Sequence, residues 1–524
     1  MRLIGFPSEI LMEILNHLDI RDLLACREVC MKFKALIDED VRAQYKFDLS
    51  VAGMQDGPPS TITTADRLSM LRVHQSAWNE FLWSAKENAP VHTGNIWELC
   101  GNVLAQSEGN RTLYFQQIPS ATRGIEGTEW TIPDVGYNIM DVSIDPAQDL
   151  LIVIEQFETN TAICRVHLRS FATGAPHPAA PPTAMLTHEP EISAFSYVIH
   201  ILEGTLGILM SSMDFDDPSE LLIWNWKTGQ LRLHIIGPGL QSWAFLTSRF
   251  LLLAHGGELI DEPRLLIIDL DSPQPSTPTL FTEADYVCAF CYPPFSNEIT
   301  VLSMCIRSSP TPTWRPSPAL SVPFSVDPAD RLFVVKFTLI DSDDEDAMLS
   351  LVPASTLLHA IATLKTGRVI IPWAEWGPHG SRLMEAPGTD ALTELYNVYG
   401  TRVAHMEREW DEAARQLHRF VVVRDFNQLA IRKAAASAAE AARRGSLLQV
   451  VQDKGQDMRI VDKNTFGLPK VLQEEVTTTL PYVERTYKLE EDDEKFSEVM
   501  LAEDAIVLVT GIWQPPMRFR ILSI

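Results

Sequence analysis

The chain of 524 residues contains few cysteines and no long hydrophobic run. Its seven cysteines are an odd number without a regular spacing, which excludes the disulfide framework of a small secreted domain. The longest apolar stretches, such as Leu251–Ala254 and Ala505–Val509, are far shorter than the roughly 20 residues that a bilayer requires. Residues 1–15 interleave charges with apolar side chains, unlike a secretory signal. We therefore expect a protein of the cytoplasm, the nucleus or both, with no membrane-spanning segment.

Basic residues are also scarce. The sequence has 43 Lys and Arg against 69 Asp and Glu, which gives a formal net charge of -26. A surface of this charge repels phosphate backbones and anionic membranes. The composition therefore predicts no nucleic-acid partner and no membrane partner.

The residue patterns of common catalytic sites are missing as well. There is no Gly-x-Ser-x-Gly elbow, and both Lys-Thr pairs, at 227–228 and 365–366, precede their glycine instead of following a glycine-rich loop. Cys288-x-x-Cys291 is half of a zinc pattern, but no second Cys or His pair is adjacent, so we interpret both cysteines as strand residues. We predict that the protein is not an enzyme and has no catalytic, cofactor-binding or metal-binding residues.

What the N-terminal segment does contain is a helical pattern. Leu11, Ile14, Leu15 and Leu18 recur at the spacing of one helix face, behind a proline, Pro7, that suits a first helical position. After a break, the pattern continues to about residue 37 through one or two further short helices. A cluster of this size rarely buries enough surface to be stable alone. It is either a cap packed on the rest of the chain or a module that a partner covers.

The motifs of this segment resemble the F-box. Residues 6–10 (FPSEI) and 14–18 (ILNHL) resemble its opening helix. Residues 22–24 (DLL) and 27–36 (REVCMKFKAL) resemble its second half, where a leucine pair precedes a Val-Cys-basic-x-aromatic-x-x-Leu run. Phe6 stands where leucine is more usual, and the basic residue of the run comes one position late. Neither departure removes an apolar contact.

The resemblance implies a substrate-recruiting subunit of a cullin-RING (SCF-type) ubiquitin ligase, which docks on the Skp adaptor and presents an unknown protein substrate. Carried over position by position, some family residues would face the adaptor and others would hold the cluster together, a division that the sequence leaves open. These residues are Pro7, Ile10, Ile14, Leu15, Leu18, Leu23, Leu24, Val29, Cys30, Phe33 and Leu36. Two alternatives remain: an F-box scaffold that acts without ubiquitination, and a propeller enzyme with an F-box-like cap.

After this segment the pattern of apolar residues in the sequence changes. A spacer helix is expected between about 68 and 82, and from about residue 97 short apolar runs alternate with Gly, Pro, Asp and Asn, as in an all-β region. Three runs end in Thr-Gly, at Gly174, Gly229 and Gly367, where glycine supplies the positive φ of a hairpin turn. Residues 223–229 resemble the end of a WD-type repeat. Repeated strand-turn-strand units favour a degenerate β-propeller.

The predicted fold class is α+β and multidomain. A small all-α F-box occupies 1–48, a linker with the spacer helix occupies 49–95, and a propeller-like substrate-binding domain of six or seven blades occupies 96–524. We expect an exposed proline-rich insertion near 308–328 and an alanine-rich helix at 434–444 on the outside of the propeller. The two tryptophans of 373–380 are expected to pack inward.

Overall fold

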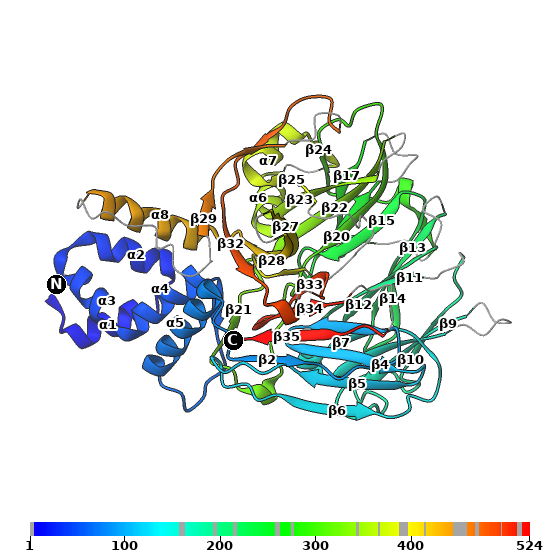
Figure 1. The fold of residues 1–524 in the computed structure, drawn as a ribbon, viewed down its shortest axis with the longest axis horizontal. Coiled ribbons are helices and arrows are strands. Elements are labelled where there is room, and N and C mark those ends of the chain that lie inside the picture. Colours follow the sequence, from blue (N-terminus) through cyan, green and yellow to red (C-terminus); the bar gives the residue numbers. More distant parts are fainter. Residues whose placement is uncertain are drawn as a thin grey trace.

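The N-terminal helices form a separate small unit in the computed structural model. The structure describes residues 5–156, 163–191, 196–212, 217–256, 262–273, 277–341, 345–364, 367–386, 397–412, 415–443, 458–466, 471–493, 495–510 and 516–524. The unit consists of α1 (Ser8–Asn16), α2 (Ile20–Val29), α3 (Met31–Glu39) and α4 (Val41–Ala52), with Pro7 as the N-cap of α1. Figure 1 shows these helices at the left, beside the much larger body of strands.

An apolar core and a set of charged contacts stabilise this helical unit. The core packs Leu11 and Leu15 of α1 against residues of α2 and α3. Asp38 of α3 accepts hydrogen bonds from Arg27 Nε of α2 at 2.5 Å and from Lys34 Nζ at 2.6 Å. Hydrogen bonds from these two cations lower the pKa of Asp38 to about 2. The carboxylate therefore stays charged and joins α2 to α3.

Seven larger sheets follow, and the first three are built from antiparallel strands in chain order. Blade 1 contains β3 (Trp97–Cys100), β4 (Val103–Glu108), β5 (Thr112–Gln117) and β6 (Thr128–Ile132). Blade 2 contains β7 (Ile139–Asp145), β8 (Leu150–Glu155), β9 (Cys164–Ser170) and β10 (Met185–His188). Blade 3 contains β11 (Ser196–Leu202), β12 (Thr205–Ser211), β13 (Ser219–Asn225) and β14 (Gln230–Gly237), with β18 (Thr279–Leu280) added parallel to β14.

The next three blades contain longer connections. Blade 4 contains β15 (Leu240–Phe245), β16 (Phe250–His255), β17 (Arg264–Asp269) and β19 (Cys288–Cys291), with β24 (Val369–Ile371) parallel to β19. Blade 5 contains β20 (Thr300–Arg307), β22 (Leu332–Ile340), β23 (Glu345–Pro353) and β25 (Arg382–Glu385). Blade 6 contains β26 (Val398–Tyr399), β27 (Arg402–Asp411), β28 (Gln416–Asp425), β32 (Tyr482–Lys488) and β29 (Met458–Val461).

The seventh blade is built from both parts of the chain. Its strands β33 (Glu498–Leu501), β34 (Ala505–Val509) and β35 (Phe519–Ser523) are completed by β2 (Ala85–Asn88), which pairs antiparallel with β35. The first strands of neighbouring blades lie side by side, as in a ring. The architecture is a seven-bladed β-propeller, which confirms the predicted fold. We expected a linker over residues 49–95. Residues 85–88 differ from this expectation, because they form β2 and belong to a blade.

The core of the propeller lies between neighbouring blades. One apolar cluster contains Leu209 of blade 3 and Leu253 of blade 4, and another contains Leu104 of blade 1 and Val507 of blade 7. Strands buried on both faces need apolar residues at nearly every position. This requirement explains continuous runs such as 150–154, all of which are buried.

Two expectations for the region 361–380 have different outcomes. Residues 361–363 belong to α6 (Ala354–Thr363), although a strand leading to a hairpin at Gly367 was predicted. That prediction was wrong, because Leu357, Leu358 and Ile361 follow a helical spacing and pack on one apolar cluster. Residues 373–380 form α7 (Trp373–Gly380), and its tryptophans pack inward as expected. The Trp376 ring is buried, and its Nε1 donates to Cys291 O at 3.1 Å.

The proline-rich segment 308–328 is not the exposed insertion that was predicted. Within it, β21 (Phe324–Val326) pairs antiparallel with β1 (Met54–Asp56), which follows α4. Phe324 is completely buried, and the Trp314 ring lies edge-on to Tyr399 of blade 6. Prolines reduce the chain entropy lost on ordering, so the segment can pack as an extended strip across one end of the propeller.

Gly207 of β12 provides a test of packing between blades. A Cβ atom at this position would lie 2.0 Å from Cη2 of Trp243, a fully buried ring of blade 4. We expect Gly207→Ala to lower the free energy of unfolding by about 1–3 kcal/mol, because the ring has no space to move. Urea denaturation measures this loss. Gly204→Ala is the control, because the nearest atom to its Cβ is 4.0 Å away, and equal stability of the two variants would contradict the packing.

Candidate protein-binding face

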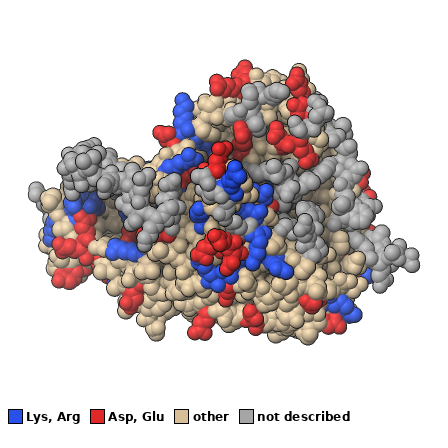
Figure 2. Space-filling model, in the orientation of Figure 1, with Lys and Arg blue, Asp and Glu red and all other residues tan. Residues whose placement is uncertain are grey.

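Large apolar side chains remain exposed on the N-terminal helices. Met31, at the start of α3, is 79% exposed, and Leu24 of α2 is 46% exposed. Ile10 and Ile14 of α1 and Val29 of α2 are exposed in the same way. Exposed apolar surface on a soluble protein commonly marks a site where a partner binds. Lys and Arg lie among Asp and Glu on the described part of the face that Figure 2 shows, so the charges of that face are mixed.

The structure divides the eleven residues that the family resemblance singled out. Three are buried in the core of the helical unit: Leu15, Leu23 and Phe33. Three are partly buried against that core: Leu18, Cys30 and Leu36. Five are exposed: Pro7, Ile10, Ile14, Leu24 and Val29. The core residues hold the helices together, and the exposed ones are available to a partner.

The set of eleven left out residues that are important in this unit, among them Met31, Leu11 and Ile37. Met31 is the most exposed of the large apolar side chains, but it was noted only as a departure from the family motif. Leu11 and Ile37 are buried core residues. Leu11 lies four positions before Leu15 on the same helix face, so helical spacing carried the signal for its burial.

A buried polar network fixes α5 (Thr64–Glu80), the helix behind this unit, to the propeller. His74 Nε2 of α5 lies 3.0 Å from Asp504 Oδ1, in the turn between β33 and β34. Arg123 donates to Asp504 Oδ2 through Nε at 2.9 Å and to Glu503 Oε2 through Nη2 at 2.9 Å. Asn102 Nδ2 also donates to Asp504, at 2.5 Å. Helix and ring are therefore joined by charges that are out of contact with water.

The charge state of this network follows from its contacts. Burial alone would raise the pKa of Asp504, but the charge of Arg123 and the hydrogen bond from His74 hold that pKa well below its usual range. Burial raises the pKa of Glu503, and burial lowers the pKa of His74. The ionised Asp504 carboxylate paired with Arg123 is therefore the electrostatic centre of the joint.

The same network holds the proline-rich strip. Glu503 Oε1 accepts from the Val326 backbone N–H at 2.8 Å, and Arg123 Nη1 donates to Phe324 O at 3.0 Å. Arg67 of α5 donates through Nη1 to Pro323 O at 3.0 Å and to Asp56 at 2.6 Å. The helices, the strip and the ring thus share one set of buried hydrogen bonds.

A second contact joins the helical unit to blade 6. Helix α8 (Gln428–Arg443), which covers part of the predicted helix 434–444, packs against α4. Asn427 Nδ2 donates to Val51 O at 2.9 Å, and Lys433 Nζ lies 3.4 Å from Asp48. Residue 444 lies outside the described residues. The helix therefore touches the helical unit as well as the propeller.

Side chains that could hold a metal occur away from this joint. Cys288 and Cys291 lie on β19 three positions apart, so they point to opposite faces of the strand. Burial raises the pKa of Cys288 to about 12, which keeps it a thiol. By contrast, His188, Glu220 and His234 bring their ligand atoms together between blades 2 and 3.

None of the helices that the structure describes is long and apolar enough to cross a bilayer.

Comparisons with known proteins address both parts of the chain. Among solved structures, the chain resembles the WD40 domain of SCAP from fission yeast, with 8% identity, a TM-score of 0.34 and coverage of 80% of this chain and 82% of that chain. It also resembles extracellular domains 1–2 of Drosophila Semaphorin 1b, with 8% identity, a TM-score of 0.38 and coverage of 84% and 88%. No curated protein matches the sequence. Residues 3–43 match the family model of the F-box domain. The chain therefore joins an F-box domain to a seven-bladed β-propeller.

Proposed function

We propose that the protein is a substrate receptor of an SCF-type ubiquitin ligase and acts in the cytoplasm, the nucleus or both. The observation that carries the proposal is the F-box domain at 3–43 with apolar side chains exposed on α1, α2 and the start of α3. The F-box resemblance implies the Skp adaptor as the partner that covers them, and through it a cullin. In this role the protein binds two partners and carries out no chemistry of its own.

The joint between the two domains supports this role. A receptor raises the rate of ubiquitin transfer by holding a substrate lysine near the conjugated ubiquitin, so the distance between its two binding faces has to be kept. The buried contacts of α5 with the turn at 503–504, and of β1 with β21, resist bending between the domains. The two domains then keep a fixed distance and orientation relative to each other.

The covered end of the propeller indicates where a substrate binds. Gly400 N donates to Ser309 O at 2.7 Å, and Val326 N donates to Glu503, so turns of blades 6 and 7 contact the strip 308–328. The α5 helix lies against the same end, because His74 contacts Asp504 of blade 7 and the Trp78 ring contacts Arg402 of blade 6. Because this end is occupied by the chain itself, we assign substrate binding to the opposite end of the ring.

Co-purification tests the proposal. The full-length protein, isolated from cells after proteasome inhibition, should carry the Skp adaptor, a cullin and ubiquitinated substrate. If the adaptor and the cullin are recovered, but no co-purified protein accumulates when the gene is deleted, the result would favour the scaffold role. If neither adaptor nor cullin is recovered, the receptor proposal is wrong.

A further inference from the structure

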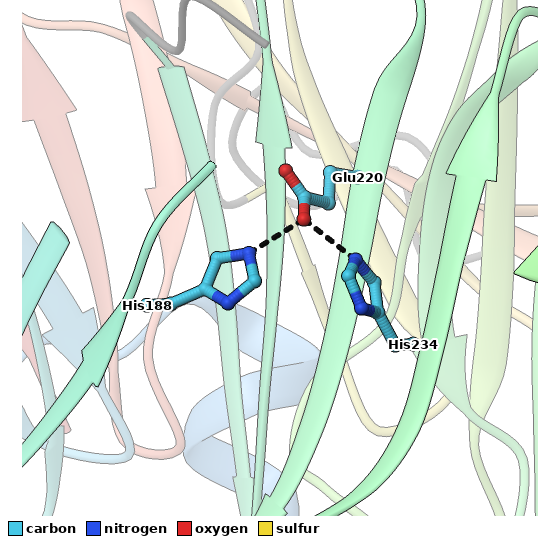
Figure 3. A group of neighbouring side chains, drawn as sticks. All are labelled: His188, Glu220 and His234. Atoms are coloured by element: carbon cyan, nitrogen blue, oxygen red, sulfur yellow. Dashed lines mark hydrogen bonds and ion pairs between the residues drawn. The ribbon is translucent and has the colours of Figure 1, made fainter. Parts of the chain in front are cut away.

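Three potential metal ligands converge between blades 2 and 3, as Figure 3 shows. His188 is the last residue of β10 in blade 2, whereas Glu220 of β13 and His234 of β14 belong to blade 3. We propose that these three side chains bind a divalent transition metal ion, of which Zn²⁺ fits the ligand set best, and that the ion joins the two blades. The site is independent of the F-box and of the proposed receptor role.

The distances favour a shared ion. Oε1 of Glu220 lies 2.5 Å from Nε2 of His188 and 2.6 Å from Nε2 of His234. The three ligand atoms all lie within 4.8 Å of one another. A tetrahedral ion with bonds of about 2.0–2.2 Å places its ligand atoms about 3.3–3.6 Å apart, so each imidazole nitrogen would move about 1 Å away from the carboxylate oxygen to admit it. Two imidazole nitrogens with one carboxylate oxygen are a ligand set that Zn²⁺ takes in proteins.

The sheet places two of the ligands without any help from the ion. Leu222 of β13 pairs with His234 of β14, so Glu220, two residues before Leu222, lies on the same face as His234. The backbone N–H of Glu191 donates to Glu220 Oε2 at 3.2 Å, which orients the carboxylate and leaves Oε1 for the histidines. The geometry is therefore pre-organised, and groups that orient a ligand in this way strengthen metal binding.

Burial supplies a reason for a cation at this position. Glu220 is completely buried, and both histidine side chains are nearly so. A buried carboxylate requires a positive partner, and no Lys or Arg contact to it is present among the described residues.

Two other, partly buried His–Glu contacts of the protein serve as a comparison. His167 Nε2 lies 2.9 Å from Glu155 in blade 2, and His405 lies 2.8 Å from Glu407 in blade 6. In each case the carboxylate has one histidine, and an arginine is its second cationic partner: Arg165 lies 3.5 Å from Glu155 and Arg424 lies 3.7 Å from Glu407. Within the described ranges, the group at 188, 220 and 234 is the one that brings three His, Cys, Asp or Glu ligands together. A hydrogen-bonded His–Glu pair does not explain why Glu220 has a second histidine, whereas a shared ion does.

The ion would leave one coordination position for water. Because its ligands come from two blades, binding stabilises the folded ring by an amount that grows with the logarithm of the ratio of free ion to dissociation constant. The predicted result is a melting temperature that rises when Zn²⁺ is restored to chelated protein.

The test uses the full-length protein after dialysis against a chelator. Zn²⁺ is added, the protein is desalted, and the metal retained per chain is measured by mass spectrometry. We expect one Zn²⁺ per chain, and Co²⁺ in its place should give the visible absorption of a four-coordinate site with N and O ligands. His234→Ala and Glu220→Gln should each weaken Zn²⁺ binding by more than about 100-fold, since even a group that only orients a ligand is worth roughly 10- to 100-fold.

His167→Ala is the matched control, because it removes a partly buried His–Glu pair of blade 2 that shares no residue with the site. This variant should keep its Zn²⁺. The proposal is overturned if the wild type retains no Zn²⁺, if Glu220→Gln retains it with unchanged affinity, or if Co²⁺ gives the charge-transfer band of a thiolate ligand. Glu220→Gln keeps the size of the side chain, so a folded variant is available even if His234→Ala does not fold.

Discussion

Leu24→Asp should lower the affinity of the protein for the Skp adaptor by roughly 30-fold or more while leaving the fold intact. The side chain is 46% exposed on α2, so the free protein tolerates a charge at this position. In the complex the same charge would be buried against an apolar surface without a partner. Such a burial costs about 2–5 kcal/mol, and every 1.4 kcal/mol is a factor of about ten in the dissociation constant.

Calorimetric titration of the purified variant with the adaptor measures this loss. Val73→Asp is the matched control, because Val73 is 55% exposed on α5, outside the proposed face, and its substitution should leave binding unchanged. Leu15→Asp is not suitable, because Leu15 is 3% exposed and a charge there would unfold the helical unit. Equal affinity of Leu24→Asp and the wild type would remove α2 from the interface.

Arg123→Leu should be the most destabilising single substitution of the interdomain joint. The guanidinium contacts Asp504, Glu503 and the Phe324 carbonyl, and nothing else that is described could neutralise both carboxylates. Removal of one partner from a buried ion pair costs about 3–5 kcal/mol, because the remaining charge stays buried. The free energy of unfolding and the melting temperature should both fall by amounts that thermal and urea denaturation resolve.

Arg249→Leu provides the comparison. Arg249 also pairs with a carboxylate, Asp269, at 2.6 Å, but its own side chain is largely exposed. Exposed ion pairs contribute about 0–1 kcal/mol, so this variant should be nearly as stable as the wild type. If the two substitutions cost the same, the network around Arg123 does not hold the joint.

Local sequence patterns were sufficient for much of the fold. The F-box motifs predicted the helices of residues 6–36, and apolar runs such as 150–155 and 332–339 predicted strands that the structure contains. The blade number was predicted as six or seven, and seven is confirmed. Helix α6 was missed because its apolar residues also fit a short buried strand, an ambiguity that periodicity does not resolve.

Contacts between distant residues were beyond those patterns. The exposed and buried members of the F-box set separate only when the helices pack together. His74, Arg123 and Asp504 come from three well-separated parts of the chain, and no local spacing links them. The same holds for His188, Glu220 and His234, because no two of them form the closely spaced ligand pair of a zinc motif. The pairing of β13 with β14 places Glu220 beside His234, and the docking of blade 2 on blade 3 adds His188.

The shared seventh blade has a consequence for how the protein is made. A ribosome releases the N-terminal helices and β2 well before β35, the strand that β2 pairs with, because β35 lies far behind them in the chain. A nascent chain can therefore display the exposed apolar side chains of α1 and α2 long before the ring can close behind them. Until β35 has been made, β2 lacks its partner strand and the seventh blade is incomplete, so the helices are attached to an open ring.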